Sequence, residues 1–181
     1  MQDKKSSVSR YSAPTVLIHW LTLLAFIGLY AAINLTDLYP KGSDTRQLLR
    51  TAHISLGLIV FGLVWLRLVF RFAGATPAIV PEPPAWQEKL AKLGHLALYG
   101  LMVLMPLLGW AGLSARGKSI PFFGVELPAL IAENHDLGRT LMDIHEALGN
   151  IGYFLIGIHA AAALYHHYFL KDNTLQRMRL R

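Results

Sequence analysis

Residues 144–170 read IHEALGNIGYFLIGIHAAAALYHHYFL, and this stretch decides the fold. Glu146 is its only acidic residue, and it contains no lysine or arginine. A helix needs about 20 mostly apolar residues to cross the ~30 Å hydrocarbon layer of a membrane, so this stretch is long enough to span it. His145 and His159 are 14 residues apart, close to a whole number of turns, and therefore share one helix face at two depths roughly 21 Å apart. Ionisable residues at membrane depth are costly and usually mark a functional site.

Three further runs have the same apolar character. The chain as a whole is 54% hydrophobic and 15% charged, which favours a membrane protein over a soluble domain. The shortest run is extended by two arginines whose charged ends reach the membrane surface, Arg67 and Arg71. We therefore predict an all-α membrane protein, a four-transmembrane-helix bundle that forms one domain over residues 1–181. The other three predicted spans are Pro14–Asn34, Thr51–Leu66 and Leu93–Leu113.

Basic residues predict the orientation of the bundle. With both termini in the cytoplasm, eleven lysines and arginines lie inside and six outside, as the positive-inside rule expects. The first span is too long for a signal-peptide core, so we predict a retained anchor. The basic character then reflects topology and contact with inner-membrane lipid, and no nucleic-acid partner is expected. The inner set is Lys4, Lys5, Arg10, Arg67, Arg71, Lys89, Lys92, Lys171, Arg177, Arg179 and Arg181; the outer set is Lys41, Arg46, Arg50, Arg116, Lys118 and Arg139.

The loops and the residue composition limit the chemistry. The chain has no cysteine, which excludes disulfides, thiolate-bound iron–sulfur clusters and covalently attached c-type haem. The proline-rich segment Thr76–Pro84 is expected to be an extended inner loop. The long outer loop Ser114–Arg139 is expected to carry a short re-entrant or interfacial helix around Pro128–Glu133.

Four histidines fall at two matching depths. His19 and His159 both lie in the inner half, whereas His53 and His145 both lie near the outer ends of their helices. Axial ligation of haem iron by two imidazoles from facing helices requires such pairs. Interhelical hydrogen bonding is the plainer interpretation of a single membrane histidine. Zinc or copper binding is a weaker alternative, because intramembrane carboxylates are almost absent.

Small residues accompany these histidines. Gly149 and Gly152 lie between the two histidines of the last span, and Gly57 lies one turn from His53. They either leave room for porphyrin planes or only allow close helix approach. Among the remaining histidines, His95 and His166 are candidates for alternative ligands or for quinone contacts, and His135 is expected in a solvated loop.

Several motifs together resemble the bacterial cytochrome b561 family. The resemblance covers nearly the whole chain and is closest to the superoxide oxidase branch. It implies two haem b groups held by His19, His53, His145 and His159, and electron transfer from periplasmic superoxide to ubiquinone in the bacterial inner membrane. The alternative is a quinone-linked subunit of a partner dehydrogenase or hydrogenase. The motifs are SAPTVLIHW (12–20), TAHISLG (51–57), WLRLVFR (65–71), LGHLALY (93–99) and the stretch from His145 to Leu175.

Charged and polar residues near the two membrane surfaces complete the predicted sites. At the outer surface, four cations are expected to steer the superoxide anion toward the outer histidines. At the inner surface, at least one of two arginines is expected near a haem propionate or quinone, and three further residues near the quinone. The alternatives are a role in topology alone for the arginines and, for the quinone, a site on the outer side near Trp110 and the loop from Ser114. The outer set is Arg46, Arg50, Arg116 and Lys118; the inner set is Arg67, Arg71, His95, Tyr165 and His166.

Overall fold

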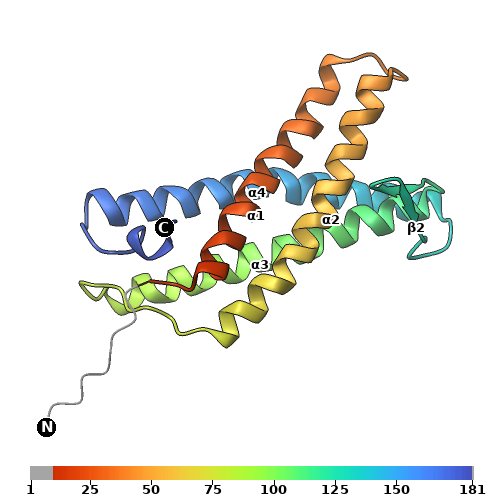
Figure 1. Ribbon diagram of the computed structural model, residues 1–181. Helices are drawn as coiled ribbons and strands as arrows, with labels where there is room; N and C mark the ends of the chain where they lie inside the picture. The colour runs from red at the N-terminus through yellow and green to blue at the C-terminus, as the bar shows by residue number, and fades with distance from the viewer. Residues whose placement is uncertain (1–9, 181) are drawn as a thin grey trace, which may run out of the picture.

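The computed structural model describes residues 10–180, and Figure 1 shows a mostly helical chain. All four long helices are long and apolar enough to cross a membrane. The fold is therefore the predicted all-α membrane protein with four spans. Lys4, Lys5 and Arg181 of the predicted inner set lie outside the described residues. The helices are α1 Ala13–Leu35, α2 Asp44–Ala73, α3 Ala85–Ala115 and α4 His135–Tyr168, with 3₁₀ turns η1 Thr36–Leu38 and η2 Gln176–Met178 and strands β1 Ile120–Phe122 and β2 Val125–Leu127.

The helices extend well beyond the apolar runs. The Ser43 side chain accepts a hydrogen bond from the Arg46 amide (3.3 Å) and so starts α2 before the predicted span. Asn134 does the same for α4 through the Leu137 amide (3.0 Å), and His135 is therefore the first residue of a helix, not part of a loop. These N-caps satisfy free amide groups at polar positions, which a hydropathy pattern does not detect.

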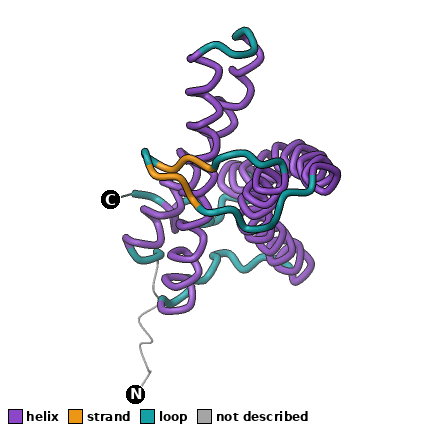
Figure 2. Tube along the Cα trace, turned by 90° about the vertical axis from the view of Figure 1, so that its right-hand side faces the viewer, coloured by secondary structure: helices purple, strands orange, loops and turns teal. Residues whose placement is uncertain are grey.

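The bundle consists of two antiparallel hairpins, α1–α2 and α3–α4. Most contacts between the long helices lie within the two hairpins, and the hairpins cross each other in Figures 1 and 2. A small core fills the crossing, with Val60 and Val64 of α2 almost fully buried against Ala25 and Leu29 of α1 and Met102 of α3. Most other large apolar side chains remain exposed, as expected for helices that face lipid.

The outer loop differs from the prediction. The prediction of a short helix around Pro128–Glu133 is wrong. This segment contains no helix and follows the two-stranded β-hairpin. Its polar groups bond to α3 instead: the Pro128 carbonyl accepts from the Trp110 indole (3.0 Å), and the Leu130 amide donates to the Ser114 hydroxyl (3.1 Å). These bonds replace those that a helix would supply.

Both ends of the described chain meet beside the α2–α3 loop. The Tyr11 amide donates to the Arg177 carbonyl (3.2 Å), and the Trp20 indole donates to the Met178 carbonyl (2.8 Å). The loop segment Thr76–Pro84 carries no helix or strand. We call this the terminal end of the molecule and the opposite one, near β1 and β2, the hairpin end.

Candidate metal centres

The structure brings together both predicted histidine pairs. Near the hairpin end, the rings of His53 (α2) and His145 (α4) have centroids 6.2 Å apart. Near the terminal end, the rings of His19 (α1) and His159 (α4) are also 6.2 Å apart. Helix α4 thus contributes one histidine to each pair, and α1 and α2 supply the partners.

The spacing of each pair fits two imidazoles that share one metal ion. A transition metal binds an imidazole nitrogen at about 2.0–2.1 Å, and the ring centre lies about 1.1 Å further, so two imidazoles that share one metal ion have centroids no more than roughly 6 Å apart. Both pairs meet this value. In contrast, the described residues 10–180 contain no group of three or more His, Cys, Asp and Glu side chains that could hold a metal ion. This ligand inventory suits an iron whose remaining ligands come from a porphyrin better than a protein-bound zinc or copper ion.

Hydrogen bonds at the hairpin-end pair set the ring tautomers. His53 Nδ1 lies 3.0 Å from the Leu29 carbonyl, and His145 Nδ1 lies 3.0 Å from the Met105 carbonyl. A carbonyl only accepts, so each Nδ1 must carry the proton and each neutral ring keeps a free lone pair on Nε2. This arrangement is typical of metal-binding histidines, whose second nitrogen donates to a backbone carbonyl.

A glycine of α3 makes room for the His145 ring. A Cβ at Gly109 would lie 3.1 Å from the ring carbon Cε1 and 3.3 Å from Nδ1. Gly57, beside His53, has open space where a side chain would be, with no atom within 4 Å. Gly152 instead allows close helix approach, because the Tyr30 hydroxyl and Leu101 occupy the space that a side chain would fill.

The terminal-end pair has a less complete set of bonds. His19 Nδ1 is buried and has no hydrogen-bond partner among residues 10–180. His95 lies beside this pair, with its ring centroid 5.5 Å from that of His159 and tilted by 74°. His95 is also within this range of His159, and it stays the alternative ligand that the sequence analysis names. An orphaned imidazole nitrogen and three clustered rings indicate a site built to hold a further group.

Arginines lie near the terminal-end cluster. Arg67 lies close enough to His19, His95 and His159 for its charge to act on all three, and its guanidinium lies 5.6 Å from the Tyr99 ring centre. Arg71 acts on His95 in the same way and also bonds to Thr76. Such a cluster suits an anion such as a carboxylate.

Arg177 is a third cation in this region that the sequence analysis did not assign to a site. It is 8% exposed, it donates to the Pro77 carbonyl (2.6 Å), and its buried Nε has no partner within the described chain. Its charge also acts on His95. Only the fold places it there, since it follows the last span by several residues and looks like an ordinary cytoplasmic arginine in the sequence.

The other residues predicted at the inner surface form a separate group. Tyr165 and His166 are neighbours, with ring centroids 6.4 Å apart. His166 Nδ1 lies 2.5 Å from a carboxylate oxygen of Asp172. No ring contact joins His95 to His166 in the described structure, so the predicted cluster separates into His95 near the histidine pair and His166 nearer the chain end.

The predicted outer cations differ in their surroundings. Arg46 is held by the Thr36 and Tyr39 carbonyls (2.7 and 2.8 Å) and by an ion pair with Asp37. Arg50, Arg116 and Lys118 are exposed and form no ion pair within residues 10–180. These three remain the free cations of the predicted set.

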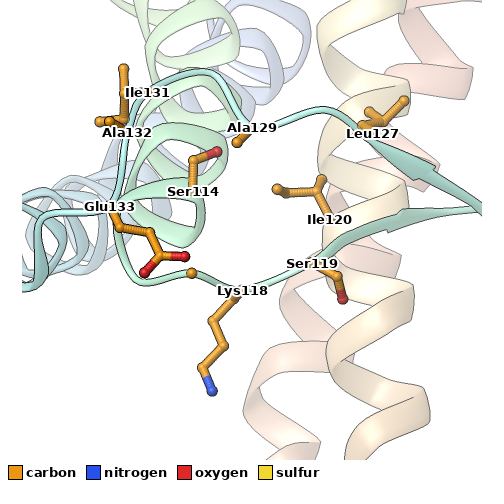
Figure 3. Close-up of a pocket in the computed structure, with 10 residues that line it drawn as sticks. Ser114, Lys118, Ser119, Ile120, Leu127, Ala129, Ile131, Ala132 and Glu133 are labelled. Atoms are coloured by element: carbon orange, nitrogen blue, oxygen red, sulfur yellow. The ribbon is translucent and has the colours of Figure 1, made fainter.

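A cavity of about 400 Å³ opens beside the β-hairpin formed by β1 and β2 (Figure 3). Lys118 and Glu133 are the charged residues in its lining, and the Lys118 side chain points away from the other side chains in the view. A Cβ at Gly117 would lie 2.9 Å from a Glu133 carboxylate oxygen, so Glu133 packs closely against the turn. The lining therefore carries one positive and one negative side chain.

Comparison with known proteins places the geometry in a wider context. The family model described as prokaryotic cytochrome b561 matches residues 10–180. The chain is 44% identical over 171 residues to cytochrome b561 homolog 1 of Escherichia coli K12, covering 94% of this chain and 97% of that protein. It is 40% identical over 169 residues to the probable superoxide oxidase CybB of Yersinia pestis (93% and 95%). It is 31% identical over 173 residues to cytochrome b561 homolog 2 of Escherichia coli K12 (93% and 90%).

Proposed function

The chain belongs to the prokaryotic cytochrome b561 family, and from this premise we propose that it is a dihaem superoxide:ubiquinone oxidoreductase. It is a multi-pass protein of the bacterial inner membrane, a b-type cytochrome that transfers electrons. We place both termini in the cytoplasm, so the hairpin end faces the periplasm.

The observation that carries the proposal is the pair of equal histidine spacings, 6.2 Å at each end of α4. His53 and His145 would hold one haem b, and His19 and His159 the other. When bound, haem iron supplies one-electron redox chemistry. The Leu29 and Met105 carbonyls orient the hairpin-end rings, and Gly109 gives His145 its space.

Arginines would balance the charge of the haem propionates. Arg67 lies close to all three histidines of the terminal-end cluster, and Arg71 and Arg177 lie close to His95. The orphaned Nε of Arg177 is suited to a buried carboxylate, which would satisfy it. We therefore assign all three arginines to the inner haem and its surroundings.

Superoxide is proposed as the donor on the periplasmic side. The reaction balances as two superoxide anions, one ubiquinone and two protons giving two dioxygen molecules and one ubiquinol. Arg50, Arg116 and Lys118 supply the free positive charge for steering, whereas Arg46 is held by Asp37 and backbone carbonyls. The relative from Yersinia pestis, named a probable superoxide oxidase, supports this donor.

Ubiquinone is proposed to be reduced at the terminal end. Two protons are consumed there, and the cytoplasm supplies them. Tyr165 is half-exposed and lies beside His166, so a quinone that approaches from the membrane would have access to this position. We assign His166 to a hydrogen bond with a quinone oxygen, whereas His95 lies in the separate group beside His159.

Stopped-flow spectroscopy of the purified protein tests the function. Superoxide should reduce the haems faster than it dismutates spontaneously, and added ubiquinone-1 should reoxidise them while ubiquinol accumulates at half the superoxide consumed. Superoxide dismutase in the same mixture is the control, and it should abolish haem reduction. Haems that stay oxidised when superoxide is supplied would reject superoxide as the donor.

A second function is favoured by the weak positive field at the hairpin end. Arg46 and Arg139 are paired with Asp37 and Asp136, and the cavity there carries both Lys118 and Glu133. A chain that accepts electrons from a partner dehydrogenase or hydrogenase subunit would not need steering of a small anion. Co-purification of a catalytic subunit with the tagged protein, together with slow reduction by superoxide, would favour this alternative.

A further inference from the structure

A buried carboxylate holds His166 from outside the helix. Asp172 is 4% exposed, and its Oδ2 lies 2.5 Å from His166 Nδ1. Its second oxygen, Oδ1, accepts from the Thr174 amide (2.8 Å). The turn that follows α4 brings it there, because Lys171 adopts a left-handed φ of 54° and the Asp172 amide bonds back to the His166 carbonyl (3.2 Å).

The segment that carries Asp172 is fixed to the α2–α3 loop. Asn173 exchanges two hydrogen bonds with the Val80 backbone (3.1 and 2.9 Å) and donates a third to the Ala78 carbonyl (3.2 Å). Arg177 adds a buried bond to the Pro77 carbonyl. The position of Asp172 is therefore fixed by bonds to His166 and by the attachment of the following residues to the α2–α3 loop. A carboxylate that only ended the helix would not need this second attachment.

The chemistry of this pair follows from its geometry. Burial raises the pKa of Asp172, but hydrogen bonds from His166 and Thr174 outweigh it and bring the pKa below its usual value, so the carboxylate is ionised at neutral pH. An ionised Oδ2 only accepts, so His166 Nδ1 carries a proton and Nε2 is left free. A carboxylate in this position also stabilises the imidazolium form and fixes its orientation.

We propose that Asp172 is a positioning residue that makes His166 a proton donor to the reduced quinone. The proton leaves Nε2 of the His166 imidazolium for a quinone oxygen, while Nδ1 keeps its proton and its bond to Asp172. The neutral imidazole then recovers a proton from water, which its 19% exposed side chain can reach. Two such transfers accompany the two electrons that form one quinol. The inference rests on the proposed function, since it needs quinone at this end.

The experiment compares Asp172→Asn with the wild type and with Asp172→Glu. Haem is first reduced with dithionite, and its reoxidation by ubiquinone-1 is followed in H₂O and D₂O. A general acid contributes about 10²–10⁴-fold, so Asp172→Asn should slow reoxidation by about 100-fold and increase the solvent isotope effect. Asp172→Glu should recover part of the rate, and both variants should keep wild-type haem content and a ubiquinone-1 KM within about twofold of wild type.

A readout independent of turnover is the tautomer of His166. ¹⁵N NMR of histidine-labelled protein should show a signal from a protonated Nδ1 of His166 in the wild type. This signal is assigned by its loss in His166→Gln. It should change in Asp172→Asn. If Asp172→Asn fails to bind haem, His166→Gln tests the same step from within the helix, and it should be equally slow.

The outcomes separate the two levels of inference. Suppose that the wild type reduces quinone normally and that Asp172→Asn or His166→Gln is reoxidised at a rate within twofold of it. That result would overturn the role of this pair and leave the proposed function standing. A wild-type protein whose haems ubiquinone-1 does not reoxidise would overturn the proposed function, and this inference with it.

Discussion

Gly152→Ala is expected to weaken the contact between the two helical hairpins. A Cβ at this position would lie less than 3.0 Å from the Tyr30 hydroxyl and 3.2 Å from a Leu101 methyl group. Tyr30 donates to the Gly149 carbonyl (2.9 Å), and this bond joins α1 to α4 between the two histidine pairs. The new methyl group therefore displaces the side chain that helps to set the spacing of His19 and His159.

The size of the effect follows from three contributions. Overpacking a well-filled contact costs about 1–3 kcal/mol. Loss of the Tyr30 hydrogen bond costs about 1 kcal/mol. Alanine gains about 1 kcal/mol over glycine inside a helix. The net loss of about 2 kcal/mol corresponds to a fall in Tm of about 4–8 °C for a chain of this size.

Thermal unfolding in detergent, followed by the haem absorbance and by circular dichroism, measures this fall. Gly157→Ala is the matched control on the same helix, because a Cβ there meets no atom within 4 Å, and it should leave Tm unchanged or raise it. Tyr30→Phe removes the hydroxyl that obstructs the new methyl group. In that background Gly152→Ala should cost at least about 1 kcal/mol less. An equal effect of Gly152→Ala in both backgrounds, or a Tm no lower than that of Gly157→Ala, would refute the reasoning.

Three further predictions concern the metal centres and the donor. His53→Ala should halve the haem content and leave the terminal-end haem, and retention of both haems at full occupancy would refute the pairing. Arg67→Gln should lower the midpoint potential of the terminal-end haem in a redox titration, since a positive charge stabilises the reduced form; unchanged potentials in both Arg67→Gln and Arg71→Gln would assign these arginines to topology alone. Haem reduction by superoxide should slow as salt rises, since fields are screened beyond about 8 Å at 0.15 M. Arg50→Glu should slow it further, and rates that respond to neither change would exclude steering.

The four spans were predictable because they depend on local composition. An apolar run of sufficient length specifies a span whatever its neighbours are, and the depths of His19 and His145 then follow from position in the run. Helix ends were less predictable: α2 and α4 begin at Asp44 and His135, where capping by Ser43 and Asn134 extends the helix into polar sequence. Hydropathy carries no signal for such caps.

Contacts between distant residues could not be predicted. The fit of Gly109 to His145, the buried Arg177 and the Asp172–His166 pair each depend on how separate elements pack. The segment Pro128–Glu133 has the composition of a short interfacial helix, but bonds to Trp110 and Ser114 of α3 hold it in an irregular path. Tertiary hydrogen bonds decide such short segments, and a single sequence does not show them.

Each of the two histidine pairs is proposed to hold one haem b. Haem extracted from the purified wild-type protein as its pyridine complex, divided by the protein concentration from amino-acid analysis, tests it most directly. The account predicts two haem b per chain, with electron paramagnetic resonance signals of low-spin, bis-histidine iron at both sites. One haem per chain, or a high-spin signal from either site, would contradict it.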